Sequence, residues 1–191
     1  MPALFRNHRM ASAALWSAVL QLALVGALVV LAGCSTGAAP SSPSSLTFVV
    51  VRHAEKARID AANPAADPSL SEAGHARASR LARVMKRTPP VAVYATRFRR
   101  TLQTAQPSAT EFGLPVLRYE AQLPAADLAR QLRGSHTQGV ILVVGHSNTV
   151  PGIVAALSGH TVPPMSEDEY GVLYRVDIGP GDEAVLERSG F

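Results

Sequence analysis

The chain has 191 residues, of which 47% are hydrophobic and 17% are charged, and its formal net charge at pH 7 is +4. This length suits a single domain, and the apolar content is enough for a core. Without the first 33 residues, which contain Arg6 and Arg9 and no acid, 16 basic and 14 acidic side chains leave a charge of +2. With so small a charge and only 5% aromatic residues, the composition argues against a nucleic-acid-binding protein.

The first 33 residues have the pattern of a secretory signal. A basic start precedes an almost wholly apolar run over residues 11–31, and the sequence Leu-Ala-Gly then leads to Cys34, the only cysteine of the chain. This pattern resembles the lipobox of bacterial lipoproteins, which implies cleavage and lipid attachment at Cys34. The alternative is an uncleaved membrane anchor, because the apolar run is long enough to span a bilayer.

Residues 34–45 are rich in Ala, Pro and Ser, and we expect them to form a flexible tether before a single domain at residues 46–191. Both interpretations of the N-terminal segment place that domain outside the cytoplasm and attached to a membrane. Ser35 follows the cysteine, and by resemblance to Gram-negative lipoproteins this favours the periplasmic face of the outer membrane.

Apolar runs and helical patterns alternate along the domain. Strands are predicted at residues 46–51, 91–94, 115–119, 139–144, 172–176 and 184–186. Helices are predicted from an N-cap at Ser71 to about residue 86, over 98–112, over 124–132 and up to about residue 157. The alternation predicts an α/β fold, a single three-layer domain with a mainly parallel sheet and helices on both faces.

Unusual polar residues follow three of the predicted strands. Arg52 and His53 follow the first strand, Arg97 and Arg100 follow the second, and His146 follows the fourth. The carboxyl ends of parallel strands meet at one edge of a sheet, so these side chains are expected to converge. Guanidinium groups bind phosphate oxygens in pairs, and a neutral imidazole attacks phosphorus. The pattern therefore predicts a phosphate pocket with a histidine nucleophile.

The segments R-H-A-E-K, R-R-T-L-Q-T-A and V-V-G-H-S-N-T resemble, in the same order, the three signatures of the histidine phosphatase superfamily, also called phosphoglycerate mutase-like. The resemblance covers essentially all of residues 46–191 and implies that fold, although the first segment has alanine where the family has glycine. It implies that His53 becomes phosphorylated and that Arg52 and Arg100 bind the phosphate. It also implies that His146 contacts the phosphate and stabilises the transition state, with no metal and no cofactor.

The acid that protonates the leaving group in larger family members has no clear counterpart. Glu120 and Asp127 lie in the short segment where those members carry it, and Glu55 lies beside the nucleophile as a possible donor or a supporting residue. Compact family members lack an obvious donor, and without one the activity should favour good leaving groups such as acyl phosphates, phosphoramidates or anhydrides. Arg97 and Asn148 are further candidates for substrate contact, and Asn148 is equally suited to cap the following helix.

Two other sites are conceivable in the same residues. Ser147 could be the nucleophile of a hydrolase elbow, but Thr149 replaces the required glycine and His160 is the only histidine downstream, with no acid between. The two pocket histidines and Glu55 could hold a metal, but the flanking arginines would repel a cation.

We therefore expect a membrane-tethered phosphatase that acts on a small phosphomonoester or pyrophosphate of the cell envelope, on a saccharide or a lipid head group. The alternative is a non-catalytic envelope lipoprotein that binds phosphate-bearing ligands. His53 argues against this alternative, because a binding module has no need of a nucleophile between two arginines. The pattern of residues predicts neither the substrate nor the oligomeric state.

Overall fold

The structure, a computed structural model, describes residues 45–58 and 67–191. The predicted signal, Cys34 and nearly all of the predicted tether lie outside the described residues. The strands are β1 (Leu46–Arg52), β2 (Pro90–Ala95), β3 (Val116–Arg118), β4 (Gly139–Gly145), β5 (Val172–Ile178) and β6 (Ala184–Gly190). The helices are α2 (Glu72–Met85), α3 (Arg99–Glu111), α4 (Ala125–Ser135) and α5 (Val150–Ser158). None of the helices in this part of the chain has the length and apolar character needed to cross a membrane.

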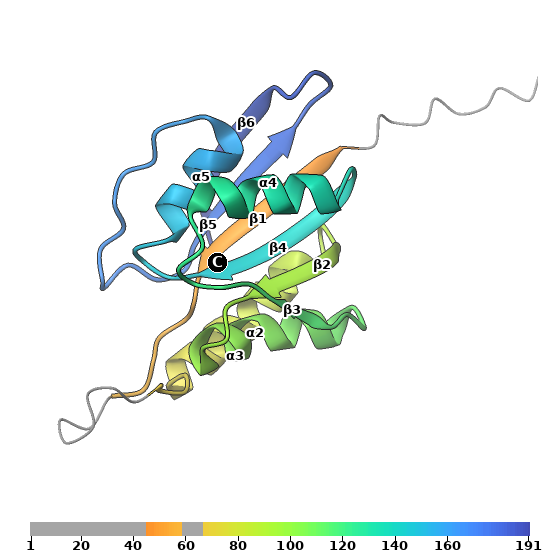
Figure 1. Cartoon of the computed structure of the whole chain (residues 1–191). Helices are drawn as coiled ribbons and strands as arrows, with labels where there is room; N and C mark the ends of the chain where they lie inside the picture. The colour runs from red at the N-terminus through yellow and green to blue at the C-terminus, as the bar shows by residue number, and fades with distance from the viewer. Residues whose placement is uncertain (1–44, 59–66) are drawn as a thin grey trace, which may run out of the picture. The chain divides into compact units, whose positions relative to one another are not determined.

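The six strands form one sheet in the order β3-β2-β4-β1-β5-β6 (Figure 1). β4 pairs in parallel with both β1 and β2, and β2 pairs in parallel with β3. β5 runs antiparallel to β1 and to β6, so the last hairpin extends one edge of the sheet. The predicted α/β domain with a mainly parallel sheet is confirmed.

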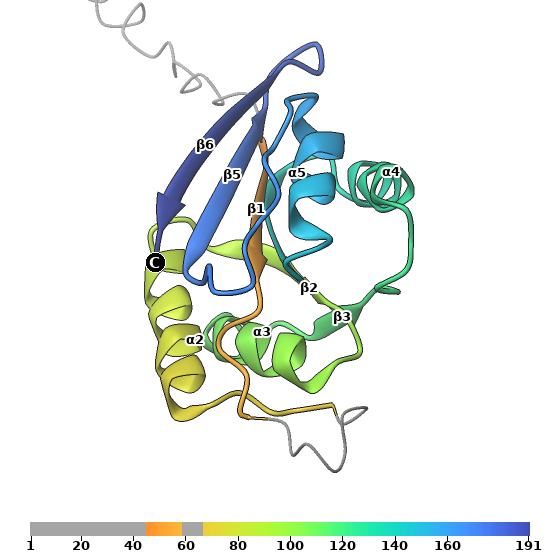
Figure 2. The ribbon, with the colours of Figure 1, turned by 90° about the vertical axis from the view of Figure 1, so that its left-hand side faces the viewer.

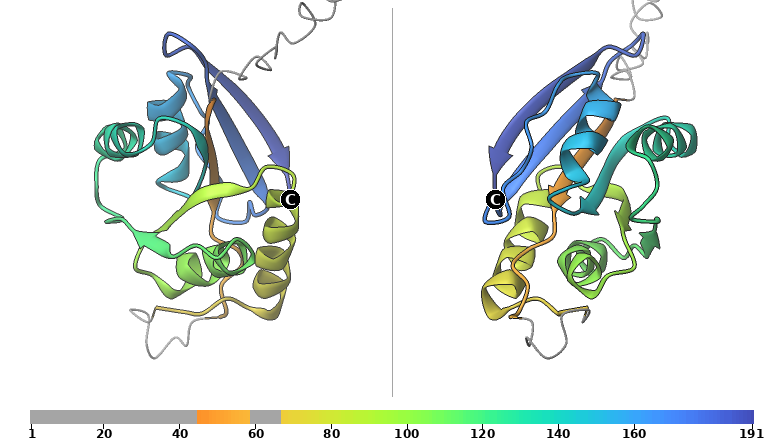
Figure 3. Two further views of the ribbon diagram at one scale, coloured as in Figure 1. Left: turned by 90° about the vertical axis from the view of Figure 1, so that its right-hand side faces the viewer. Right: turned by 60° about the vertical axis from the view of Figure 1, so that its left-hand side comes forward.

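β1 is buried along its whole length because helices cover both faces of the sheet. Phe48 and Val50 belong to the core on the side of α4 and α5, whereas Val49 and Val51 belong to the core on the side of α2 and α3. Figures 2 and 3 show these two helix pairs on either side of the sheet. Successive side chains of a strand point to opposite faces, which explains why this strand is continuously apolar rather than alternating.

The start of α2 holds the chain segment that follows His53. The Ser71 hydroxyl accepts a hydrogen bond from Gly74 N, which confirms the predicted N-cap. The Ser71 amide donates to the carbonyl oxygen of Glu55 at 2.9 Å, and a Cβ atom on Gly74 would lie only 2.2 Å from that oxygen. Glycine at this position therefore allows the helix to approach the backbone beside the predicted nucleophile.

The boundaries differ from prediction mainly at the end of α4 and in the last strand. α4 continues to Ser135, past Gly134, whereas the pattern predicted an end at residue 132. Leu128 and Leu132 pack in the core against α5, and this packing stabilises the helix through its last turn. β6 continues to Gly190 because it pairs with β5 along its whole length, although few of its residues are apolar.

Candidate active site

β1, β2 and β4 end side by side, and the residues that follow them form one cluster. Arg52 pairs with Gly145 in the register of β1 and β4, and His53 N donates to the Gly145 carbonyl oxygen at 2.9 Å. The rings of His53 and His146 lie 5.4 Å apart between centroids. Nη2 of Arg100, from the start of α3, lies 3.4 Å from Nδ1 of His146. The structure thus brings Arg52, His53, Arg100 and His146 together, as the strand ends predicted.

A cavity of about 490 Å³ opens over this cluster. Two histidines and one arginine of the cluster line it, together with side chains from five separate loops. The lining residues are His53, Lys56, Phe98, Arg100, Ala121, Gln122, His146, Ser147, Asn148, Thr149 and Glu167. We refer to this cavity as the strand-end pocket.

His53 is buried and held in one tautomer. Its Nδ1 lies 2.7 Å from the carbonyl oxygen of Ala54. A carbonyl oxygen only accepts hydrogen bonds, so Nδ1 carries the ring proton and Nε2 keeps its lone pair. Burial, with smaller contributions from His146, Arg100 and Arg52, lowers the pKa of His53 to about 3. The imidazole is therefore neutral at physiological pH, which is the form that attacks phosphorus.

The second predicted motif supports the backbone of the first. Thr104 of α3 accepts a hydrogen bond from Ala54 N at 2.9 Å and donates to the Arg100 carbonyl oxygen at 2.7 Å. The neighbouring Gln103 accepts from Leu70 N at 2.7 Å through its Oε1 atom. These contacts fix Ala54 and Leu70, at the two ends of the segment between β1 and α2, relative to α3. They therefore also fix the position of the Ala54 carbonyl that orients His53.

His146 lies at the end of a chain of hydroxyl groups. Arg100 can only donate, so the His146 Nδ1 atom facing it accepts, and His146 Nε2 donates to Thr96 Oγ1 at 3.0 Å. Thr96 in turn donates to Thr101 Oγ1 at 2.8 Å, and Thr101 donates to the Phe98 carbonyl oxygen at 2.8 Å. Burial, then Arg100 and Arg52, lowers the pKa of His146 to about 4. The two threonines were not predicted as site residues.

Arg52 is almost completely buried and is anchored by backbone oxygens. Its Nη1 atom donates to the carbonyl oxygens of Ser166, Glu167 and Glu169 at 2.8–3.0 Å. Its guanidinium carbon lies 4.1 Å from the centre of the Tyr170 ring. Its Nε atom is buried and has no hydrogen-bond partner within the described part of the chain. Such a donor costs about 1–3 kcal/mol unless a ligand or water accepts from it.

The unpaired Nε atom marks the side of Arg52 that still has a hydrogen bond to donate, and Arg52 itself is buried and is not among the residues that line the strand-end pocket. A guanidinium group presents Nε and Nη2 along one edge, and an oxyanion accepts from both atoms of such an edge. The opposite atom, Nη1, is held by the three carbonyls, so the Nε–Nη2 edge of Arg52 has a fixed direction. A phosphoryl group bound there would satisfy the unpaired donor.

Glu167 is a pocket residue that the sequence patterns did not indicate. Its Oε1 atom accepts a short hydrogen bond from Ser147 Oγ, and its Oε2 atom lies 3.2 Å from Arg52 Nη2. The Ser147 hydrogen bond first, and then Arg52, Lys56 and His53, hold the pKa of this carboxyl below its usual value. Its side chain is 72% exposed, in contrast to Arg52 at 2%.

The acids considered from the sequence lie outside the strand-end pocket. Glu55 accepts from Arg77 Nε at 2.9 Å through both of its oxygens, and this pairing lowers its pKa. Glu120 lines a separate cavity of about 300 Å³. Asp127 pairs with Arg130 on α4 at 2.9 Å. The structure therefore brings none of these three carboxylates into the pocket and supports Glu55 only as a structural partner of α2.

The other candidates divide between the pocket and the surface. Asn148 lines the pocket, but its side chain does not cap α5, whose N-cap residue is Thr149. Arg97 lies over the Phe98 ring at 5.6 Å and is not among the lining residues. Arg100 pairs through Nη1 with Asp67, in the segment between β1 and α2, at 3.3 Å.

The structure does not favour the two alternative sites. Ser147 donates to Glu167, and the His160 ring contacts the Ser158 carbonyl oxygen at 2.9 Å, so no Ser–His pair forms between them. In residues 45–58 and 67–191, no group of three His, Cys, Asp or Glu side chains is arranged to hold a metal ion.

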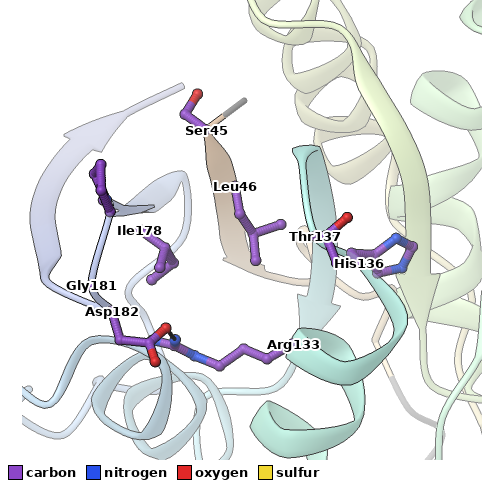
Figure 4. A pocket seen from close by; sticks show the side chains of 10 residues that line it. Ser45, Leu46, Arg133, His136, Thr137, Ile178, Gly181 and Asp182 are labelled. Carbon is purple, nitrogen blue, oxygen red and sulfur yellow. Dashed lines mark hydrogen bonds and ion pairs between the residues drawn. The ribbon is translucent and has the colours of Figure 1, made fainter. Parts of the chain in front are cut away.

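A different cavity, of about 530 Å³, lies at the start of β1, where Ser45 enters the domain (Figure 4). Arg133 reaches across it to Asp182 at 3.1 Å and also donates to the Leu157 carbonyl oxygen at 2.7 Å. Its guanidinium is therefore already engaged, and none of the predicted site residues lines this cavity. The residues predicted for phosphate chemistry cluster at the strand-end pocket instead.

Comparison with known proteins supports this assignment. The model of the histidine phosphatase superfamily (branch 1) matches residues 48–124, a range that contains Arg52, His53 and Arg100. His146 lies beyond that range, and the structure places it in the same pocket. A comparison with curated proteins finds no match.

Solved structures of this family share the fold. The putative phosphohistidine phosphatase SixA from Agrobacterium tumefaciens has a TM-score of 0.58 at 19% identity, covering 78% of this chain and 100% of that chain. The protein histidine phosphatase SixA complexed with tungstate has a TM-score of 0.58 at 19% identity, with 75% and 96% covered. A mycobacterial glucosyl-3-phosphoglycerate phosphatase has a TM-score of 0.60 at 15% identity, with 77% and 98% covered.

The likeness to these structures confirms the predicted phosphoglycerate mutase-like fold. The family match extends from β1 to the start of α4 and includes the nucleophile segment and both predicted phosphate arginines. The chain is therefore similar to the histidine phosphatase superfamily over residues 48–124, as its motifs predicted, and it shares the fold of solved phosphatases.

Proposed function

We propose that the protein is a metal-independent phosphatase that hydrolyses small phosphomonoesters or pyrophosphates of the cell envelope through a phosphohistidine at His53. The observation that carries this proposal is the tautomer of His53, whose Nδ1 proton is held by the Ala54 carbonyl oxygen. The free Nε2 lone pair belongs to a neutral imidazole beside Arg52 and Arg100. A nucleophile and two phosphate-binding cations thus occupy one site.

In the first step, His53 Nε2 attacks phosphorus, and the bond to the leaving-group oxygen breaks. The Nε–Nη2 edge of Arg52 and the guanidinium of Arg100 hold the phosphoryl oxygens while charge develops on them. A bound dianion opposes the lowering of the His146 pKa by burial, Arg100 and Arg52, and so favours a protonated His146 that donates to the phosphoryl group. In the second step, water attacks the phosphohistidine, releases phosphate and regenerates the neutral His53.

The pocket supports the proposed substrate class, and the N-terminal segment supports the proposed location. The pocket volume of about 490 Å³ suits a small phosphorylated molecule, and Lys56 adds a cation for a second anionic group. Lipid attachment at Cys34 would hold the domain at the periplasmic face of the outer membrane. Ser45, the first described residue, lies at the start of β1, and His53 follows the other end of this seven-residue strand, roughly 20 Å away.

The test uses the full chain purified in detergent, with a chelator present and a panel of phosphoesters and pyrophosphates. We expect wild type to release phosphate, and we expect His53→Ala to lose that activity. The control is His75→Ala, an exposed histidine of α2, which should retain it. Absence of turnover by wild type on every substrate would contradict the enzyme proposal, and tight phosphate binding without turnover would favour the non-catalytic alternative. Activity that survives in His53→Ala would contradict the mechanism.

The location has a separate test. Replacing Cys34 with serine should prevent lipid labelling in cells and release the protein from the membrane fraction. Lipid labelling that persists in this variant would contradict attachment at Cys34. Loss of labelling with full membrane retention would identify an uncleaved anchor instead.

A further inference from the structure

The Glu167 carboxylate pairs with the Nε–Nη2 edge of Arg52, to which we assign the phosphoryl group. Its Oε2 atom lies 3.2 Å from Arg52 Nη2. Nη2 and the unpaired Nε are the two donors of this edge. Glu167 also accepts from Ser147 Oγ at the wall of the pocket. A phosphoryl group that binds both Nε and Nη2 must therefore displace this carboxylate from Arg52.

The displacement reverses the electrostatic environment of Glu167. In the free pocket, Ser147 and Arg52 favour the ionised carboxylate. When a phosphate dianion takes Arg52, the carboxylate loses a cation and gains a negative neighbour. Both changes raise the pKa of a carboxyl group. Substrate binding thus favours the protonated form of Glu167.

The backbone of Glu167 is held by a hydrogen bond, whereas its side chain is exposed to solvent. The Glu167 carbonyl oxygen accepts from Arg52 Nη1 at 2.8 Å, which fixes the main chain beside the phosphate site. The side chain is 72% exposed, so it can turn toward the pocket mouth without moving the backbone. In an in-line displacement the leaving group departs on the side opposite the nucleophile, away from the buried His53.

Among the residues of 45–58 and 67–191 that line the strand-end pocket, Glu167 is the one carboxylate. Asp67 contacts the pocket residue Arg100, but it is engaged by Arg100 Nη1 at 3.3 Å and by Arg99 N at 2.9 Å. Glu55 is held by Arg77. The acid missing from the sequence patterns is therefore best supplied from the loop between α5 and β5.

We propose that Glu167 is the catalytic acid and base of this site, an inference that rests on the proposed phosphatase function. Once a phosphoryl group displaces it from Arg52, protonated Glu167 gives its proton to the leaving-group oxygen as the P–O bond breaks and His53 Nε2 bonds to phosphorus. The resulting carboxylate then takes a proton from the water that attacks the phosphohistidine. The enzyme returns to its starting protonation state after phosphate leaves.

The test compares substrates that differ only in the leaving group, in the full chain purified in detergent. Glu167→Gln keeps the size and the hydrogen bond from Ser147 but has no proton to give. We expect kcat/KM for an alkyl phosphate to fall about 10²-fold or more, and kcat/KM for p-nitrophenyl phosphate to fall less than about 10-fold. Glu167→Asp should restore part of the alkyl phosphate activity. The matched control is Asp168→Asn in the same loop, an exposed carboxylate that is not among the pocket-lining residues and whose replacement should show no leaving-group dependence.

The results separate this inference from the proposed function. Phosphorylation of His53 by p-nitrophenyl phosphate, detected by mass spectrometry at alkaline pH, tests the phosphohistidine and should occur in wild type and in Glu167→Gln. Equal losses on both substrates would overturn the assignment of Glu167 as an acid. A lower KM with unchanged kcat would also overturn it, because Glu167 would then be only a competing counter-ion. No label on His53 in wild type would overturn the proposed function itself.

Discussion

The two buried histidines make the stability of the domain depend on pH. Burial and nearby charges lower the pKa of His53 to about 3 and that of His146 to about 4, from 6.5. An unfolded chain keeps both near the ordinary value, so below that pH the unfolded state binds more protons than the folded state. The free energy of unfolding must therefore fall as the pH drops from about 6.5 toward the folded-state values. At pH 5 each histidine lowers it by about 2 kcal/mol relative to pH 8.

Urea denaturation of wild type and His53→Asn at pH 8, 7, 6 and 5 measures this effect. Asparagine does not titrate in this range, so the variant should lose about 2 kcal/mol less than wild type between pH 8 and pH 5. His75→Asn, at an exposed position of α2, should lose as much as wild type. If His53→Asn shows the full wild-type loss, the fold does not keep this imidazole neutral, and the argument for its nucleophilic form is refuted.

Two further substitutions test the anchor of Arg52 and the approach of α2. Arg52→Lys keeps the charge but removes Nε and the fixed edge, so kcat/KM should fall about 10²-fold or more, and steady-state kinetics on a phosphoester would show this. Gly74→Ala places a Cβ atom 2.2 Å from the Glu55 carbonyl oxygen and should lower the midpoint of thermal unfolding, whereas Gly134→Ala, with no atom within 4 Å, should not. An unchanged midpoint for Gly74→Ala would contradict the close packing described.

Residue patterns predicted the centre of the fold and most of the phosphate site for one physical reason. β1 and β4 are covered on both faces, so they appear as continuous apolar runs, and their ends mark the sheet edge where Arg52, His53 and His146 meet. Arg100 follows β2, and the pairing of β2 with β4 brings it to the same edge.

The remaining site residues depend on contacts that the sequence does not display. Glu167 lies 115 positions from Arg52, in a loop with no periodic pattern, and only the folded chain shows that the two side chains meet. Glu55 lies two positions from His53, yet its carboxylate is captured by Arg77 of α2. Thr96 becomes a partner of His146 because β2 and β4 are neighbours in the sheet. Proximity along the chain was therefore a poor guide to which carboxylate enters the pocket.

The anchoring of Arg52 by backbone oxygens determines which sequence changes the loop between α5 and β5 can tolerate. The three acceptors are carbonyl groups of residues 166, 167 and 169, so they persist whatever side chains those positions carry. Mutation can exchange the side chains of this loop and alter substrate preference while the arginine keeps its direction. Insertions or deletions in the loop would move the carbonyls themselves. Apart from Glu167, whose carboxylate we assign to catalysis, selection on such a segment should thus tolerate changes of residue type and reject changes of length.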